Sequence, residues 1–115
     1  MNQFGTVGKQ LRELRHKRNL LQTEVAKLCR LYQGRISEYE TGKRLPTVLN
    51  LLKLSACFEL YPEQVKILVR LLISEAMKLR PNERKSILQS VNCRECHILM
   101  QEFELDTAEF YKLQV

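Results

Sequence analysis

The 115-residue sequence predicts an all-α protein. Apolar residues recur with the 3.6-residue helical period along nearly the whole chain, and no window alternates β-branched and polar residues as a half-buried strand does. Residues that start or stop helices divide this pattern into segments, among them Asn19, Gly42 and Pro62. The length suits one domain, or one small domain with an appendage, and a core of this size needs no disulfide or metal cross-link.

The first helix is predicted from an apolar stripe at helical spacing, formed by Phe4, Val7, Leu11 and Leu14. Basic residues lie largely outside this stripe, so the exposed face of the helix is positively charged. Asn19 is expected to end the helix, because asparagine tolerates the left-handed backbone conformation that closes many helices.

A second helix is predicted to begin near Gln22 and to end near Arg30 or Leu31. Leu21 and Glu24 have the spacing of a capping box, but leucine lacks a side-chain acceptor, which forgoes about 1 kcal/mol. The residues that this helix turns inward are Val25, Ala26, Leu28 and Cys29.

A third helix is predicted from Tyr32 or Gln33 to Glu40, and Gly42 stops it. Its buried residues are Ile36 and Tyr39. The second and third helices are both short and joined by a tight connection, which is the arrangement that presents a helix to a DNA major groove.

In this region the sequence resembles the helix-turn-helix domain shared by phage Cro and C1-type repressors and by the xenobiotic-response-element class of bacterial regulators. The resemblance covers roughly residues 5 to 70 and implies a five-helix, lambda-repressor-like DNA-binding domain over residues 1–70. The features that match are Gln22, Ala26, Leu31, Ile36 and the run YETGKRLP. Two positions depart from the family pattern, because Arg30 stands where the turn usually has glycine, and Tyr32 where Ser or Thr usually caps the third helix.

The resemblance also implies which residues contact DNA. Base edges would be read by residues of the third helix, namely Gln33, Gly34, Arg35, Ser37 and Glu38. Phosphate contacts are expected separately, from Gln22 at the start of the second helix and from Lys43 and Arg44 in the loop after the third, and the charge of Arg18 adds to them. Arg15 and Glu40 would form a buried, structural ion pair. The alternative is that these residues form an ordinary solvated surface.

A fourth helix is predicted after Pro46, with Thr47 near its start, and a fifth is predicted from Pro62 to Arg80. The fifth helix has a broad apolar stripe, formed by Val65, Leu68, Val69, Leu72, Ile73, Ala76 and Leu79. Ile67 and Leu71 lie outside this stripe, so the helix is apolar on more than one side.

A helix with so wide an apolar surface must be covered from two sides. We expect a second copy of the chain to cover one of them, through an interface formed by Val65, Leu68, Val69, Leu72, Ile73 and Ala76. The alternative is that residues 81–115 fold back and cover the excess within one chain.

Residues 71–115 are predicted to form a helical extension of the DNA-binding domain and a dimerisation region. Its helices are expected from Pro81 to about Val91, from about Glu95 to Phe103, and after Asp106. Each has too few apolar residues to fold alone, so the extension should pack on the fifth helix or on its mate.

The charge of the chain is divided unequally. Residues 1–70 hold 13 Lys and Arg against 6 Asp and Glu, a net charge of +7, whereas residues 71–115 hold 6 against 7, a net charge of −1. An anionic partner such as double-stranded DNA is therefore expected at the first part. The sequence has no secretory signal or membrane span, which predicts a cytoplasmic protein with reduced thiols.

The run Cys93-Arg-Glu-Cys96-His97 is the one pattern that suggests chemistry. Two small buried side chains on an apolar helical face explain both cysteines, and a metal or redox site remains the alternative. Neither His16 nor His97 has a nucleophile partner, and no Gly-rich phosphate loop occurs, so neither an enzyme nor a cofactor is predicted.

These observations together predict a sequence-specific DNA-binding transcriptional regulator. The favoured form is a homodimeric repressor that binds a pseudo-palindromic operator through the major groove. Two alternatives stay open: an antitoxin-type module that holds a protein partner through the C-terminal helices, and a redox- or metal-responsive regulator that acts through Cys93 and Cys96.

Overall fold

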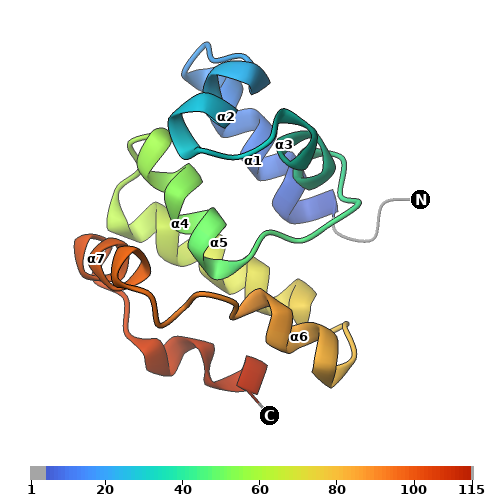
Figure 1. Cartoon of the computed structure of the whole chain (residues 1–115), viewed down its shortest axis with the longest axis vertical. Coiled ribbons are helices and arrows are strands. Elements are labelled where there is room, and N and C mark those ends of the chain that lie inside the picture. The colour runs from blue at the N-terminus through green and yellow to red at the C-terminus, as the bar shows by residue number, and fades with distance from the viewer. Residues whose placement is uncertain (1–4, 115) are drawn as a thin grey trace.

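The computed structural model describes residues 5–114 and contains no strand among them, so the predicted all-α fold class is confirmed. The elements are α1 Gly5–Lys17, α2 Gln22–Cys29, α3 Gln33–Glu40, α4 Val48–Cys57, α5 Pro62–Ala76, α6 Pro81–Ile87, α7 Arg94–Glu102 and the 3-10 helix η1 Thr107–Gln114. Figure 1 shows α1, α2 and α3 gathered at one end of the molecule and α6, α7 and η1 at the other, with α4 and α5 between them.

α2 and α3 begin at the predicted Gln22 and Gln33, α3 ends at the predicted Glu40, and α2 ends at Cys29, just before the predicted end near Arg30 or Leu31. Asn19 has a φ of 54° after α1, and Arg30 has a φ of 56° after α2. Leu21 precedes α2 without a side-chain cap, while its N–H donates to the Glu24 carboxylate at 2.8 Å, which is half of the predicted capping box. Phe4, assigned to the stripe of the first helix, lies outside the described residues.

Gly8 sets the distance between α1 and α3. A Cβ on Gly8 would lie 2.8 Å from the carbonyl oxygen of Glu40 and would overlap the carbonyl oxygen of Tyr39. Both obstacles are backbone atoms at the end of α3, which have little room to move. Only glycine therefore allows the two helices to approach as closely as they do.

The fourth and fifth helices start with recognisable caps. The Thr47 hydroxyl accepts the N–H of Asn50 at 3.1 Å, and Pro62 is the first residue of α5. The predicted end of α5 at Arg80 is wrong, because α5 ends at Ala76. Pro81 explains part of the difference, since a proline holds the preceding residue in extended conformation, and Arg80 has a φ of −68° and a ψ of 155°.

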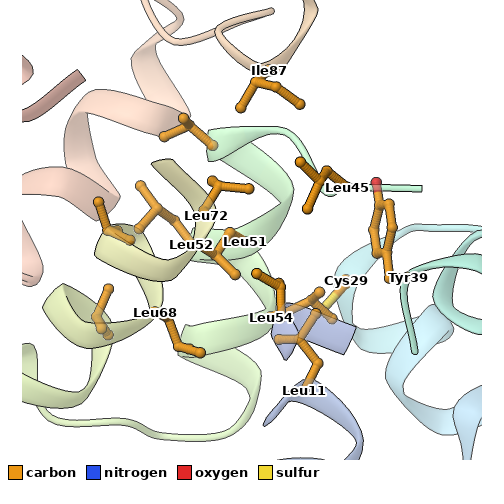
Figure 2. Close-up of a cluster of buried hydrophobic side chains, with 14 of the residues drawn as sticks. Leu11, Cys29, Tyr39, Leu45, Leu51, Leu52, Leu54, Leu68, Leu72 and Ile87 are labelled. Carbon is orange, nitrogen blue, oxygen red and sulfur yellow. The ribbon is translucent and has the colours of Figure 1, made fainter. Parts of the chain in front are cut away.

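The C-terminal segment folds back on the same chain. α7 packs against α4, and η1 packs against α5 and α6, so that one apolar core includes both parts of the chain. α6 ends at Ile87, earlier than the predicted end near Val91, and the Ile87 side chain is buried in this core. Figure 2 shows part of the core, with Leu51 and Leu52 of α4, Leu72 of α5 and Ile87 of α6 labelled.

This packing corrects the predicted dimer interface. Five of its six residues are at most 3% exposed within a single chain, namely Val65, Leu68, Val69, Leu72 and Ala76. Ile73 is partly buried against the same core. The periodicity identified the apolar face correctly, but α1, α4 and η1 of the same chain cover it, and of these η1 belongs to the segment that the folding-back alternative named. The boundary drawn after residue 70 also falls inside α5.

Glu75 joins the two parts of the chain. It lies near the end of α5, is only 5% exposed, and accepts the N–H of Val7 through Oε1 at 2.9 Å. The first N–H groups of a helix lack partners within the helix and carry a partial positive charge, which a carboxylate neutralises. Glu75 therefore caps the start of α1 from 68 residues away.

Candidate nucleic-acid interface

A bidentate ion pair lies beneath the third helix. The Arg15 side chain of α1 donates from Nε to Oε2 of Glu40 at 2.7 Å and from Nη2 to Oε1 at 3.0 Å. The two residues are 8% and 9% exposed, so little water reaches the pair. A third bond, from Nη1 of Arg15 to the carbonyl oxygen of Leu20 at 2.8 Å, also ties the pair to the loop before α2. This is the structural pair that the resemblance implied.

A line of amide hydrogen bonds connects this pair to the protein surface. Gln22 donates from Nε2 to Oε1 of Glu40 at 3.0 Å, and Gln33 donates from Nε2 to Oε1 of Gln22 at 2.7 Å. Gln22 is the first residue of α2 and Gln33 the first of α3. The ion pair thus fixes the amide orientation of an exposed side chain at the start of the third helix.

The remaining residues predicted to read bases share the outer face of α3. Gly34 is exposed with open space around it, and Arg35, Ser37 and Glu38 are partly exposed. Glu38 lies between two cations, 3.7 Å from the Arg35 guanidinium and 3.7 Å from that of Arg44. These two cations reduce the repulsion between the Glu38 carboxylate and any phosphate bound nearby.

The residues predicted to hold phosphates divide into two groups. Lys43 and Arg44 are exposed in the α3–α4 connection, and Gln22 opens α2, all on the side of the molecule that carries α3. Arg18 is used elsewhere, because it donates from Nε to the carbonyl oxygen of Phe58 at 2.9 Å and pairs with Glu59 at 2.9 Å. Arg18 is thus a C-terminal cap of α4, and we leave it out of the phosphate set.

The end of α3 is anchored to α4 as well. Asn50 donates from Nδ2 to the Tyr39 hydroxyl at 2.9 Å. Tyr39 is 2% exposed, and burial raises the pKa of its hydroxyl above the usual value of 10.0. α3 is therefore held at its start by Gln22 and at its end by Asn50.

Sequence reasoning missed two residues on which this arrangement depends. Gly8 lies on the buried face of α1 together with Val7 and Leu11. A glycine at such a position indicates a close approach of another backbone, and this was the signal that the sequence offered. Glu75 carried no such signal, since an acid near the end of an amphipathic helix usually lies in solvent. Its partner is known only once the chain is folded.

The cysteine and histidine run is held by packing and capping. Cys96 is fully buried, and desolvation raises the pKa of its thiol to about 11. Cys93 precedes α7, where its Sγ accepts the N–H of Cys96 at 3.4 Å, while His97 is exposed. Within residues 5–114, no three Cys, His, Asp or Glu side chains are grouped so that they could hold a metal ion.

Cys29 is also a buried thiol. Its Sγ approaches the carbonyl oxygen of Lys53 at 3.6 Å, and burial raises the pKa of the thiol to about 12. Cysteines that stay protonated are poor nucleophiles and weak metal ligands. The described geometry therefore assigns Cys29 and Cys96 to the core.

Two short helices at a fixed angle, a polar outer face on the second and a basic loop after it define a DNA-binding helix-turn-helix protein. Residues 11–65 match the family model described as Helix-turn-helix, and this part of the chain belongs to the Cro/C1-type helix-turn-helix family. No curated protein and no solved structure gave a significant match. The chain thus carries the DNA-binding domain of a transcriptional regulator.

A separate question is whether any part of the chain crosses a membrane. Among the described residues, no helix combines the length and the apolar character that a crossing requires.

Proposed function

We propose that this protein is a homodimeric transcriptional repressor that binds a pseudo-palindromic operator and competes with polymerase for it. The observation that carries the proposal is the hydrogen-bonded line from the buried Arg15–Glu40 pair through Gln22 to Gln33. A surface glutamine in solvent needs no such support. Fixing its amide in advance lowers the entropy lost when that amide pairs with a base.

In the proposed complex, α3 lies in the major groove. Gln33 and Arg35 have the donors and acceptors for bidentate contacts with adenine and guanine, and Glu38 accepts from cytosine N4. Gly34 and Ser37 are small enough to let the helix approach the base edges. Gln22, Lys43 and Arg44 bind phosphate oxygens and set the register of the helix on the duplex.

A double substitution tests the reading face. Gln33→Ala with Arg35→Ala should abolish the difference in affinity between operator and random DNA, because both base-pairing side chains are gone, while circular dichroism stays unchanged. The operator is first obtained by selecting bound duplexes from a random pool. The matched control is Gln101→Ala with Arg94→Ala, which removes the same two side-chain types from exposed positions on α7. Undiminished discrimination by the Gln33 and Arg35 variant would show that α3 does not read the bases.

The homodimer needs an interface other than the buried stripe. Ile67 is 55% exposed on α5, and Leu71, one turn later, is only partly buried. We place the contact between the two copies on this outer face of α5, since Ile67 is the large apolar residue of the helix that the chain leaves exposed. Two copies related by a two-fold axis then match the symmetry of the operator.

Light scattering tests this arrangement. The unmodified protein should have twice the mass of one chain, and Ile67→Asp should give folded monomers that bind half-sites weakly. Glu63→Ala, an exposed change one turn earlier, should leave the dimer intact. A wild-type protein that is monomeric at micromolar concentration would exclude the homodimer.

A protein partner at the C-terminal helices is the second candidate function. It is favoured by a groove of about 510 Å³ between α5 and η1, with Ile73 and Met77 in its lining and Lys66, Arg70 and Lys112 around them. An antitoxin-type module would hold an acidic segment of its toxin there. Coexpression with a candidate toxin should give a complex that Met77→Asp disrupts and that Gln33→Ala leaves intact. A complex unaffected by Met77→Asp would exclude this groove as the binding site.

A further inference from the structure

A groove lined by both parts of the chain lies beside the proposed reading helix. It has a volume of about 740 Å³ and runs between two walls that are distant in sequence. One wall comes from the α2–α3 turn, α3 and the α3–α4 connection, and the other from α6 and the turn that follows it. Figure 1 shows α6 beyond the α3–α4 connection, on the side away from the first three helices.

Buried apolar side chains hold the two walls together. Leu45 of the α3–α4 connection is 6% exposed and Ile87 of α6 is 4% exposed, and both belong to the single core of the chain. Both are labelled in Figure 2. Because the lining of the groove includes these core residues, the position of α6 relative to the reading helix is fixed by packing rather than by a flexible linker.

The charge of the groove is one-sided. Its first wall carries four cations, Arg30, Arg35, Lys43 and Arg44, whereas its second wall carries Ser86, Gln89 and the acid Glu83. Arg35, Lys43 and Arg44 also belong to the proposed base and phosphate contacts. The groove is therefore continuous with the face that meets DNA.

We propose that this groove receives one sugar-phosphate strand of the bound duplex, so that α6 and its following turn form a second wall of the DNA interface. This inference rests on the proposed function. A duplex whose major groove holds α3 must pass its backbone strands along the flanks of that helix, and the groove occupies one of those flanks. The clustered cations suit repeated phosphates better than they suit a single small anion.

Gln89 is the side chain of the second wall that contacts phosphate. The Ser86 hydroxyl already donates to the carbonyl oxygen of Glu83 at 2.6 Å, and the Glu83 carboxylate accepts the N–H of Arg80 at 3.2 Å. Gln89 is exposed, lines the groove and has an amide that donates to phosphate oxygen without adding charge.

Matched charge substitutions test the second wall. Gln89→Glu places a negative charge in the groove, and Gln101→Glu places the same charge at an exposed site on α7 that does not line the groove. Binding to selected operator and to random DNA is measured for both variants over a range of salt concentrations. We expect Gln89→Glu to weaken both affinities by about tenfold at low salt, because a carboxylate then faces phosphate, and Gln101→Glu to change them by less than about twofold.

The reverse change gives an independent readout. Gln89→Lys should strengthen binding and steepen the salt dependence by about one released counterion, whereas Gln101→Lys should leave the slope unchanged. If the wild type binds operator and the Gln33 and Arg35 variant loses discrimination, yet both Gln89 variants behave like their Gln101 controls, the second wall is refuted and the proposed function stands. If the wild type binds no DNA at moderate salt, both are refuted.

Discussion

The helices that carry the candidate DNA contacts and the segment after α5 share one apolar core, but the former also have a partly buried network of ion-pair and amide hydrogen bonds. Under α3 the contacts are directional, as in the Arg15–Glu40 pair and the Gln22 and Gln33 amides. The C-terminal segment instead contributes buried apolar side chains to the core, namely Ile87, Cys96, Met100, Phe103, Phe110 and Leu113. Directional bonds define where a side chain points, whereas apolar burial requires only that shapes fit. Directional contacts are therefore concentrated beneath the proposed reading helix.

The largest effect is expected from breaking the ion pair. Glu40→Gln should lower the free energy of unfolding by about 3–5 kcal/mol, because it leaves the Arg15 guanidinium buried without a counter-charge. Replacing both partners, Arg15→Met with Glu40→Leu, should restore most of the stability. DNA discrimination should stay impaired, because Gln22 loses the Glu40 carboxylate to which it donates and can no longer fix the orientation of the Gln33 amide. Urea unfolding and DNA-binding assays measure the two quantities. Recovery of both in the double variant would contradict a positional role for the pair.

A substitution that disturbs the close approach of α1 and α3 should lower the stability nearly as much. Gly8→Ala is expected to cost about 1–3 kcal/mol, because the new methyl group meets the backbone of Tyr39 and Glu40 and pushes the helices apart. Gly5→Ala in the same helix is the control, since nothing lies within 4 Å of its Cβ. Thermal unfolding of both variants gives the comparison. Equal melting temperatures would show that α1 and α3 move apart at little cost.

A substitution of a buried residue in the C-terminal segment should have a smaller effect on stability than the changes at Glu40 and Gly8. Phe110 is 1% exposed, and Phe110→Leu keeps an apolar side chain but removes part of the buried ring, so we expect the free energy of unfolding to fall by about 1–2 kcal/mol with DNA discrimination unchanged. Unfolding in urea and binding to operator DNA are measured on the same variant. Loss of discrimination in this folded variant would mean that the reading helix depends on the C-terminal packing as closely as on its own ion pair.

The smallest effect is expected at the α2–α3 turn. Arg30 has a φ of 56°, a conformation that costs an L-residue about 1–2 kcal/mol and glycine almost nothing, so Arg30→Gly should stabilise the protein by about 0.5–1 kcal/mol. Asn19→Gly, at a φ of 54°, should change stability less, because asparagine tolerates this conformation. Since Arg30 also lines the basic groove, Arg30→Gly should reduce the salt dependence of DNA binding. A destabilised Arg30→Gly variant would show that the arginine side chain contributes more than its strain costs.

The predictable part of the fold is the part that depends on neighbours in sequence. The start of α2 at Gln22 and the left-handed Asn19 follow from signals within a few residues, namely the spacing of Leu21 and Glu24 and the conformational tolerance of asparagine. The same reasoning extended α5 to Arg80, because the apolar period continues beyond Ala76, where the helix stops. Periodicity reports which face of a helix is apolar, and says nothing about the length over which the backbone stays helical.

In the candidate site, too, features that depend on neighbouring residues or on a known family pattern were predictable, and contacts between distant segments were not. The family resemblance implied that residues of α3 contact DNA bases and that Arg15 pairs with Glu40, and both assignments were made on that ground. Arg18 was assigned to phosphate on its charge alone, and its actual partners, Phe58 and Glu59, are 40 and 41 residues away. The stripe around Leu72 was assigned to a second copy because nothing in α5 itself indicates that α1, α4 and η1 cover it. Contacts between distant segments are where local patterns stop being informative.

The hydrogen bond from Val7 to Glu75 links a residue that is synthesised early to one that is synthesised late. A protein is synthesised from its N-terminus, so Val7 is made 68 residues before the carboxylate that receives its N–H. Contacts of such sequence separation are also slow to form during refolding, because a long loop must close first. The first helix to be made is therefore one of the last to acquire its final hydrogen bond.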